Sequence, residues 1–358
     1  MLSMLPAPSF ILLLFTATIL EASTVRKIYV AGSGLDMFSL AETVNEVIRL
    51  SGLAKPHILY VGTATYDDPW PFHEQTKGFA ERGCRVSALN VAWLQPSATE
   101  LKTSFATADV ILLSGGNTLF AADRWVKLGI DVLMKQALND GAVLSGGSAG
   151  FISLCNGGHS DSMAPDSYKN PPGPLLNPSA EARVVVDANW AYIRAPGIGI
   201  INSLCCPHYD MTGSNGVHRA VDFAAMLQRH SGEDAIGVDN FAALVITGDS
   251  YRVISRAGKP GSAGPDGSFV ANRTGVPAVW RLRTDLESGV LVRTLVPVMG
   301  ELAAILVPPR YLAPETQLPV ARQQNPDDGH PADWNSTGSA TLVGSAVRYL
   351  RRNPGWWH

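Results

Sequence analysis

The sequence predicts an α/β protein, a three-layer sandwich with a mostly parallel sheet. After residue 25, short apolar runs alternate with longer segments whose apolar residues recur at helical spacing, which is the pattern of βαβ units. The apolar runs are nearly continuous, as expected for strands that are covered on both faces. Glycines follow three of them, at 32–34, 115–116 and 146–150. Because ligands bind beyond the carboxyl ends of parallel strands, these glycine-rich segments indicate one common site.

The first half of the chain supplies most of the predicted sheet. Residues 38–52 are predicted to form a helix because Leu40, Val44 and Val47 lie at helical spacing and Gly52 ends the pattern. The same criteria locate the other elements of this half. We predict strands at 27–31, 57–61, 85–89, 110–113 and 142–144, and further helices at 72–82 and 118–138.

The second half has a less regular pattern. Residues 156–181 are rich in Gly, Pro, Asn and Ser and are expected to form a long loop. The Gly-rich stretch 257–276 is expected to be an insertion or a surface hairpin, and residues beyond about 307 are Pro-rich and polar. Between these segments we predict a helix at 217–228 and strands at 183–186, 198–201, 235–238, 242–247, 251–255, 279–282 and 290–296.

The composition indicates a globular chain with no nucleic-acid partner. Of its 358 residues, 46% are hydrophobic and 16% are charged, which suits a large core in one or two domains. The formal net charge is −3, and no basic run or basic–aromatic stripe is present. We divide the chain into a signal peptide at 1–23, an α/β domain at 24–307 and a loosely ordered tail at 308–358.

The N-terminal segment is typical of a secretory signal. Residues 9–20 form an apolar block that is short for a membrane span, and Ala22 and Ser23 suit cleavage. No Lys or Arg precedes the block, so an uncleaved anchor or a misassigned start is the alternative. A cleaved signal implies a secreted or secretory-pathway protein without stable membrane association, and the alternative location is the cytoplasm. Sequons at 272–274 and 335–337 would carry glycans in a secreted chain.

Four cysteines are compatible with this location. An even number of cysteines, here Cys84, Cys155, Cys205 and Cys206, is usual in disulfide-bonded secreted chains, but the pairing cannot be read from the sequence. Adjacent cysteines such as Cys205 and Cys206 would be strained if they paired with each other. The sequence has no Cys-x-x-Cys pair, so we predict no structural zinc site.

The strongest chemical signal is Gly-Gly-Ser-Ala-Gly at 146–150, which follows a predicted strand. A serine between glycines at a strand end is the sequence form of a nucleophile elbow, a strained turn that exposes the hydroxyl above a sheet. The same pattern also occurs in ordinary turns. Ser148 is therefore a candidate nucleophile, and it needs a base, an orienting acid and an oxyanion hole from elsewhere in the chain.

His208 and Asp239 are the candidates for the base and the acid. Each follows a short apolar strand, which is where catalytic groups lie in this architecture. A structural histidine and a turn or cap aspartate are the simpler interpretations. The chain order Ser148, His208, Asp239 differs from the Ser–acid–His order of α/β-hydrolases, which disfavours a lipase or an esterase.

An oxyanion requires two backbone N–H donors. Ala149 directly follows the candidate nucleophile and supplies one of them. Gly116, within Ser-Gly-Gly-Asn-Thr at 114–118, supplies the other, since glycine lets the backbone approach a substrate. Alternatively, this turn only caps the following helix or binds phosphate at its N-terminus.

Four motifs follow one another along the chain: Ser-Gly-Gly-Asn-Thr-Leu-Phe from residue 114, Gly-Ser-Ala-Gly from 147, Cys-Pro-His-Tyr from 206 and Gly-Val-Asp from 237. This is the order seen in peptidase family S51, which includes dipeptidase E and cyanophycinase. The chain resembles this family over roughly residues 27–255. The resemblance implies a fold similar to the class I glutamine amidotransferases, which is flavodoxin-like.

The resemblance also implies roles for single residues. Ser148 matches the family nucleophile and His208 its base, and Gly116 and Ala149 match its oxyanion-hole positions. Asp239 falls where the dipeptidase usually has glutamate, so the third member of the triad departs from the family pattern.

Two further residues are implied to bind substrate. Arg219 lies in a stretch that matches the dipeptidase's receptor for a substrate carboxylate, with Arg194 as a competitor. An exposed helix arginine is the simpler interpretation of either. Asp161, in a loop after the serine helix, is expected to contact a substrate amine.

We therefore expect a serine-type peptidase that hydrolyses small peptides, such as N-terminal Asp-X dipeptides, through an acyl-enzyme. No metal and no organic cofactor is implied. A cyanophycinase-like exopeptidase is the first alternative. A secreted binding protein without activity is the second, because Asp239 and the loop at 160–163 depart from the dipeptidase pattern.

Overall fold

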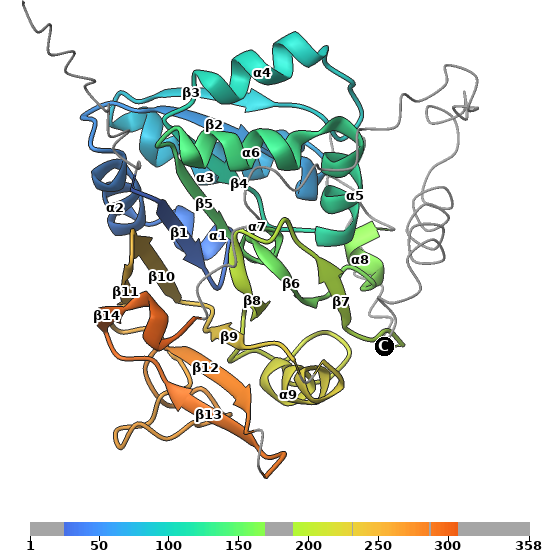
Figure 1. Ribbon diagram of the computed structural model, residues 1–358, viewed down its shortest axis with the longest axis vertical. Coiled ribbons are helices and arrows are strands. Elements are labelled where there is room, and N and C mark those ends of the chain that lie inside the picture. Colours follow the sequence, from blue (N-terminus) through green and yellow to red (C-terminus); the bar gives the residue numbers. More distant parts are fainter. Residues whose placement is uncertain (1–24, 169–188, 231, 286–287, 307–358) are drawn as a thin grey trace, which may run out of the picture.

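The computed structural model describes most of the predicted α/β domain (Figure 1). The predicted signal peptide at 1–23, strand at 183–186 and tail at 308–358 lie outside the described residues, as does the sequon at 335–337. None of the described helices is long and apolar enough to cross a membrane. The described residues are 25–168, 189–230, 232–285 and 288–306.

A mixed sheet forms the centre of the molecule. Its strands are β1 (Lys27–Ala31), β2 (His57–Val61), β3 (Arg85–Leu89), β4 (Val110–Leu113), β5 (Val143–Gly147), β10 (Ala242–Thr247), β11 (Ser250–Ser255) and β14 (Met299–Glu301). Within the described residues their order is β14-β11-β10-β1-β5-β4-β2-β3. The strands β1 to β5 run parallel, whereas β10, β11 and β14 add antiparallel to the edge beside β1.

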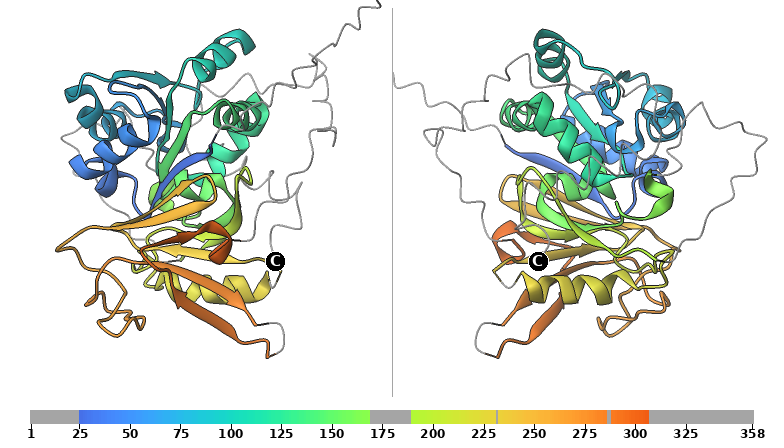
Figure 2. Two further views of the ribbon diagram at one scale, coloured as in Figure 1. Left: turned by 60° about the vertical axis from the view of Figure 1, so that its left-hand side comes forward. Right: turned by 90° about the vertical axis from the view of Figure 1, so that its right-hand side faces the viewer.

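Helices cover both faces of this sheet and produce three layers (Figures 1 and 2). Alternation along β1 directs Ile28 and Val30 into one hydrophobic cluster and Tyr29 and Ala31 into another. The Tyr29 face carries α1 (Leu35–Phe38), α2 (Ala41–Ser51) and α3 (Pro69–Glu81). The Ile28 face carries η1 (Thr63–Thr65), α4 (Ala98–Ala106), α5 (Thr118–Leu128), α6 (Ile130–Asn139) and α7 (Ala149–Leu154).

A second sheet packs against α7 and the Ile28 face of the first. Its strands are β6 (Cys155–Ser160), β7 (Ile193–Pro196), β8 (Ile201–Cys206), β9 (Ala235–Val238), β12 (Val279–Thr284) and β13 (Leu291–Leu295). Within the described residues their order is β13-β12-β9-β8-β6-β7, with β6, β8 and β9 parallel. The helix α9 (Arg219–Arg229) covers its outer face through Phe223 and Leu227 (Figure 2). The remaining short elements are α8 (Pro165–Tyr168) and η2 (Leu302–Ala304).

The predicted α/β class is confirmed, but the sheets are less parallel than expected. The expected loop at 156–181 begins instead with β6, a strand that was not predicted because it contains two glycines, Gly157 and Gly158. These glycines are needed because the neighbouring strands approach closely. A Cβ on Gly157 would lie 2.7 Å from the Ala195 carbonyl oxygen, and one on Gly158 would lie 2.3 Å from that of Cys205.

Several element boundaries also differ from the prediction. The expected helix at 118–138 is two helices, because Gly129 adopts a left-handed conformation with φ of 70° and ends α5. The strand expected at 198–201 begins only at Ile201, and α4 and β14 were not predicted. Weak apolar periodicity explains the miss at α4, which is stabilised at its start by a capping box between Ser97 and Glu100.

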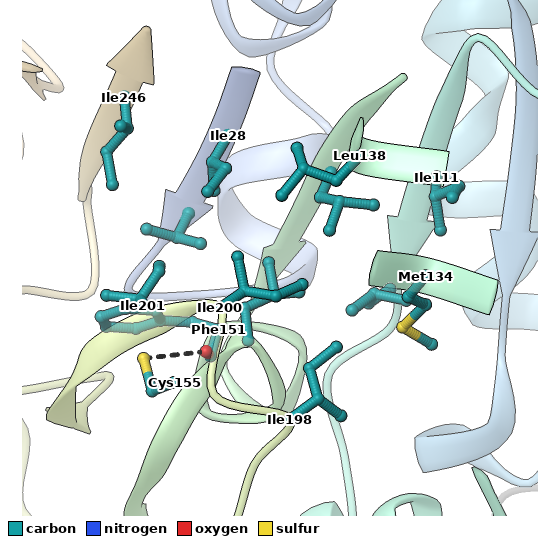
Figure 3. Close-up of a cluster of buried hydrophobic side chains, with 14 of the residues drawn as sticks. Ile28, Ile111, Met134, Leu138, Phe151, Cys155, Ile198, Ile200, Ile201 and Ile246 are labelled. Carbon is teal, nitrogen blue, oxygen red and sulfur yellow. Dashed lines mark hydrogen bonds between the residues drawn. The ribbon is translucent and has the colours of Figure 1, made fainter. Parts of the chain in front are cut away.

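The space between the two sheets is filled by aliphatic side chains. Figure 3 shows Ile28 of β1, Phe151 of α7 and Ile201 of β8 within this cluster, and none of the three is more than 3% exposed. Burial of apolar surface on this scale is the main stabilising contribution to such a core. The core therefore fixes α7, and with it the turn that precedes α7, against both sheets.

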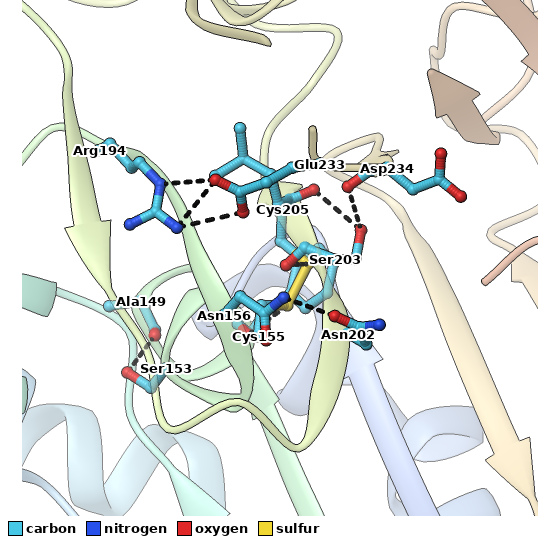
Figure 4. Close-up of a disulfide and its surroundings, with 12 residues drawn as sticks. Ala149, Ser153, Cys155, Asn156, Arg194, Asn202, Ser203, Cys205, Glu233 and Asp234 are labelled. Atoms are coloured by element: carbon cyan, nitrogen blue, oxygen red, sulfur yellow. Dashed lines mark hydrogen bonds and ion pairs between the residues drawn. A yellow bond between two sulfur atoms is a disulfide. The ribbon is translucent and has the colours of Figure 1, made fainter. Parts of the chain in front are cut away.

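A disulfide reinforces the same contact. Cys155, which directly follows α7, is bonded to Cys205 of β8, with 6.3 Å between the Cα atoms (Figure 4). Cys84 and Cys206 are buried free thiols. The disulfide therefore ties the helix that begins after Ser148 to the strand that leads to His208.

Loss of this disulfide is expected to destabilise the fold. The bond closes a sequence separation of 50 residues, for which the chain-entropy relation gives about 4 kcal/mol of stabilisation. The double variant Cys155→Ala/Cys205→Ala should lose stability of that order in urea unfolding, and reductant should have no further effect on it. The parent should lose a similar amount when reductant is added, and Cys84→Ala serves as the control. Equal unfolding midpoints for the parent with and without reductant would contradict the bond.

Candidate active site

Ser148 lies at a sharp turn between β5 and α7. Its backbone has φ of 54° and ψ of −118°, a conformation that is strained for a residue with a side chain. Gly147 is required before it, since a Cβ there would lie 2.3 Å from the Ser33 carbonyl oxygen. The Ser148 N–H donates to the Ala31 carbonyl over 3.2 Å, and the residue is half-buried. This is the geometry that a nucleophile elbow requires.

His208 is held at the same strand end. It follows β8 through Pro207, has a left-handed backbone with φ of 49°, and is half-buried. Its N–H donates to the Gly32 carbonyl over 3.2 Å. The N–H groups of Ser148 and His208 are therefore hydrogen-bonded to consecutive carbonyls at the carboxyl end of β1, those of Ala31 and Gly32. The structure brings the predicted nucleophile and the predicted base to one place.

The partner of the imidazole is Asn240, which directly follows Asp239. His208 Nδ1 lies 2.6 Å from Asn240 Oδ1, while Asn240 Nδ2 donates to Asp36 Oδ2 over 2.9 Å. Because the amide NH₂ is used by Asp36, the oxygen faces His208 and can only accept, so Nδ1 carries the proton. Nε2 is then the basic nitrogen. Burial and the positive charge of Arg219 lower the pKa of His208, which keeps the imidazole neutral at neutral pH.

Asp239, the predicted acid, does not orient His208. Its carboxylate accepts from the N–H and the hydroxyl of Ser262, both over 2.8 Å, and from the Ala278 N–H over 2.9 Å. Successive residues at a strand end point in opposite directions, so Asp239 faces the 256–278 segment while Asn240 faces the imidazole. Burial and the nearby charge of Asp210 raise the pKa of Asp239. The expected contact between Asp239 and His208 is therefore wrong, and the next residue, Asn240, makes the contact instead.

The two segments that were predicted to supply the oxyanion donors lie beside Ser148. Ala149 is the first residue of α7, and an N–H in the first turn of a helix has no acceptor within that helix. On the other side, a Cβ on Gly115 would lie 3.3 Å from Ser148 Cβ, and Gly116 follows with φ of 110°. Asn117 caps α5 by accepting from the Phe120 N–H over 3.0 Å. The turn at 114–118 therefore caps the helix and also packs against Ser148.

Asp161 and Arg219, the predicted substrate residues, bind each other. Their side chains form an ion pair in which Arg219 is 6% exposed and Asp161 is 36% exposed. Arg219 also donates to the His159 carbonyl over 3.3 Å, and its guanidinium lies 4.9 Å from the centre of the Tyr192 ring. Burial opposes the ionisation of Asp161, but the nearby positive charge of Arg219 is the main influence that lowers its pKa.

The ion pair corrects the role expected of Arg219, since a buried arginine that already binds a carboxylate is not an open receptor for a second one. Its competitor Arg194 forms a double hydrogen bond with Glu233, at 3.1 Å from each nitrogen (Figure 4). Asp161 is the more exposed member of its ion pair with Arg219. Within the described residues, no group of three or more His, Cys, Asp or Glu side chains is arranged to hold a metal ion.

Asn240, which contacts His208, and Asp36, which contacts Asn240, were missed by the sequence analysis. Asn240 was passed over because an acid was sought and its neighbour Asp239 supplied one. Asp36 lies just after the glycine-rich segment 32–34. That segment was expected to lie at the site, but no side chain near it was considered. A polar residue next to a predicted strand end was the available signal in both cases.

A family model described as "Peptidase family S51" matches residues 28–254. The chain belongs to this family. Among curated proteins it is similar to a Trypanosoma brucei brucei protein named G2/mitotic-specific cyclin-1, with 28% identity over 68% of this chain and 79% of that protein. It is also similar to the uncharacterized peptidase YgaJ of Bacillus subtilis (strain 168), with 26% identity over 46% of this chain and 59% of that protein.

The chain is also similar to two solved structures, and the first of them agrees with the S51 assignment at the level of the fold. A crystal structure of a peptidase from an acI-B1 Actinobacterium covers 78% of this chain and 98% of its own, with a TM-score of 0.53 and 18% identity. A putative peptidase E from Listeria monocytogenes EGD-e gives a TM-score of 0.45 at 15% identity, over 64% of this chain and 98% of its own. The similarity with a TM-score of 0.53 confirms the flavodoxin-like fold that the four sequence motifs imply. The family model confirms the resemblance to family S51.

Proposed function

We propose that this S51 chain is a serine peptidase in which Ser148 is the nucleophile, His208 the general base and Asn240 the residue that orients the imidazole. The observation that carries the proposal is the pair of hydrogen bonds from Ser148 and His208 to the carbonyls of Ala31 and Gly32. Two strained residues converge there from separate strands. Strain of this kind is retained where the surrounding structure enforces it, and active sites are the usual place.

The reaction follows from the tautomer of His208. Nε2 removes the Ser148 hydroxyl proton while Oγ attacks a peptide carbonyl, and the N–H groups of Ala149 and Gly116 stabilise the oxyanion. The imidazolium then passes its proton to the leaving amine, and water releases the acyl group through the same base. No hydrogen bond joins Ser148 Oγ to His208 among the described residues; such contacts often tighten only when substrate binds.

A neutral residue can occupy the third position of such a triad. Cysteine proteases of the papain type pair histidine with asparagine, because the main requirement on this residue is to hold the tautomer and the ring orientation. Asn240 meets that requirement through its 2.6 Å contact with Nδ1. This supports an active enzyme over the alternative of an inactive binding homologue.

We further propose that the substrate is a small peptide with a free amine that binds near Asp161. The carboxylate of Asp161 is the exposed half of the buried ion pair with Arg219, and its charge acts on His208. Engagement of Arg219 by Asp161 favours a cyanophycinase-like or broader exopeptidase over strict Asp-X specificity. Dipeptides with N-terminal Asp, isoaspartyl peptides and cyanophycin distinguish these cases.

Export through the secretory pathway is the location that we propose. The Cys155–Cys205 disulfide supports it, because disulfides persist mainly in oxidising compartments. The apolar block at 9–20 supports it independently.

A fluorophosphonate probe is expected to label Ser148. The Oγ–phosphorus bond forms as fluoride leaves, and the proton passes to His208. Ser148→Ala should abolish labelling, and His208→Ala should slow it by roughly 10²-fold or more. Labelled-peptide mass spectrometry gives the site, and two variants distant in sequence from it, Ser104→Ala at a half-buried residue and His73→Ala at an exposed one, serve as controls. Full labelling of Ser148→Ala would end the proposal.

Acetylation of the substrate's N-terminus is expected to lower kcat/KM. A charge-assisted hydrogen bond contributes about 1.5 to 3 kcal/mol, so the loss should be roughly 10- to 100-fold for any peptide that is cleaved. The measurement compares each free peptide with its acetylated form at pH 7. Equal kcat/KM values for the two forms would exclude an amine subsite at Asp161.

A further inference from the structure

The carboxylate nearest to the imidazole along the hydrogen-bond network is Asp36. His208 Nδ1 donates to Asn240 Oδ1 over 2.6 Å, and Asn240 Nδ2 donates to Asp36 Oδ2 over 2.9 Å. Ser33 fixes this carboxylate: its hydroxyl donates to Asp36 Oδ2 and accepts from the Asp36 N–H, each over 3.2 Å. The network joins residues that are 204 positions apart in sequence.

The other acidic side chains around His208 are committed elsewhere. Asp161 pairs with Arg219, and Asp210 pairs with Arg273 over 2.7 Å while also accepting from the Asn240 N–H. Asp239 accepts from Ser262 and Ala278, as described above. Within the part of the chain that the structure describes, no cation pairs with Asp36.

Two hydrogen bonds in series transmit the electrostatic effect of the Asp36 carboxylate to the imidazole through the Asn240 amide. A carboxylate that accepts from Nδ2 polarises the amide and makes Oδ1 a stronger acceptor, because hydrogen bonds in a chain strengthen one another. The same contact prevents the amide from turning its NH₂ toward Nδ1, which would reverse the tautomer and block Nε2 as a base. Removal of Asp36 would therefore affect the electrostatics of the imidazole and its orientation together.

We propose that Asp36 is a positioning residue for His208 and that, acting through Asn240, it supplies the negative charge that a Ser–His–acid triad places directly beside the imidazole. The site is then a relay of four side chains, Ser148, His208, Asn240 and Asp36, in which the acid is one residue further away than usual. This inference rests on the proposed role of His208 as a base. Because Asp36 is exposed, salt weakens its effect.

The test exchanges the last two members of the relay. Asp36→Asn removes the charge, and Asp36→Asn/Asn240→Asp returns a carboxylate to the network, now in contact with His208 and with an amide behind it. Asn240→Asp alone sets two carboxylates face to face. Glu42→Gln, which removes an exposed acid of α2 that pairs with Arg256, is the matched control.

The readout is the pH dependence of Ser148 labelling by the fluorophosphonate, which rises as His208 loses its proton. Asp36→Asn should lower the labelling rate roughly tenfold. It should also move the midpoint to lower pH by about half to one unit, since the lost negative charge no longer favours the imidazolium. The exchanged double variant should recover the rate to within about threefold and raise the midpoint above that of the parent.

A second readout separates this inference from the proposed function. NMR titration of the His208 ring requires no catalysis, and urea unfolding confirms that each variant is folded. Absence of labelling in the parent would end the serine-peptidase proposal, and the His208 titration would still report whether Asp36 acts on the imidazole. Unchanged midpoints in Asp36→Asn by both methods, or a double variant no faster than Asp36→Asn, would overturn the inference.

Discussion

The carboxyl end of β1 is the constraint on which the site depends. The carbonyls of Ala31, the last residue of β1, and of Gly32, which follows it, accept from the N–H groups of Ser148 and His208. Both acceptors are backbone groups at the end of a buried central strand, so the sheet fixes their positions. Close packing at this point permits only glycine at 32, where a Cβ would lie 1.9 Å from the Asp239 carbonyl oxygen. The same contact brings the end of β9, and with it Asn240, to the imidazole.

Charge is distributed around this point in a consistent way. Two buried charges have a partner of opposite sign, Arg219 with Asp161 and Asp210 with Arg273, because an unpaired buried charge is costly. The exposed parts of the network are carboxylates, Asp36 and the outer half of Asp161. Burial and Arg219 hold the imidazole neutral, and the acids act against that shift. The proposed role of His208 as a base requires both influences, because the imidazole must be neutral at the start and become an imidazolium during the reaction.

Sequence patterns located the strand ends well and the side-chain contacts less well. Glycine spacing and apolar runs predicted β1, β5 and the Ser148 turn, because these depend on local backbone geometry. β6 was missed, since its glycines are required by neighbouring strands that the sequence does not reveal. Asp239 was chosen in place of Asn240 because the sequence does not show which of two adjacent residues at a strand end faces His208. The Arg219–Asp161 pair and the Cys155–Cys205 bond depend on tertiary contacts between distant segments and were not predictable.

The central claim is that Ser148 forms a covalent bond with a substrate carbonyl while the backbone holds the oxyanion. A crystal structure of the protein with a peptide boronic acid tests it most directly. The account predicts boron bonded to Ser148 Oγ, one boron oxygen within hydrogen-bonding distance of the Ala149 N–H, and His208 Nε2 within reach of the adduct. An inhibitor bound to another residue, or a boron oxygen directed away from Ala149 and Gly116, would contradict it.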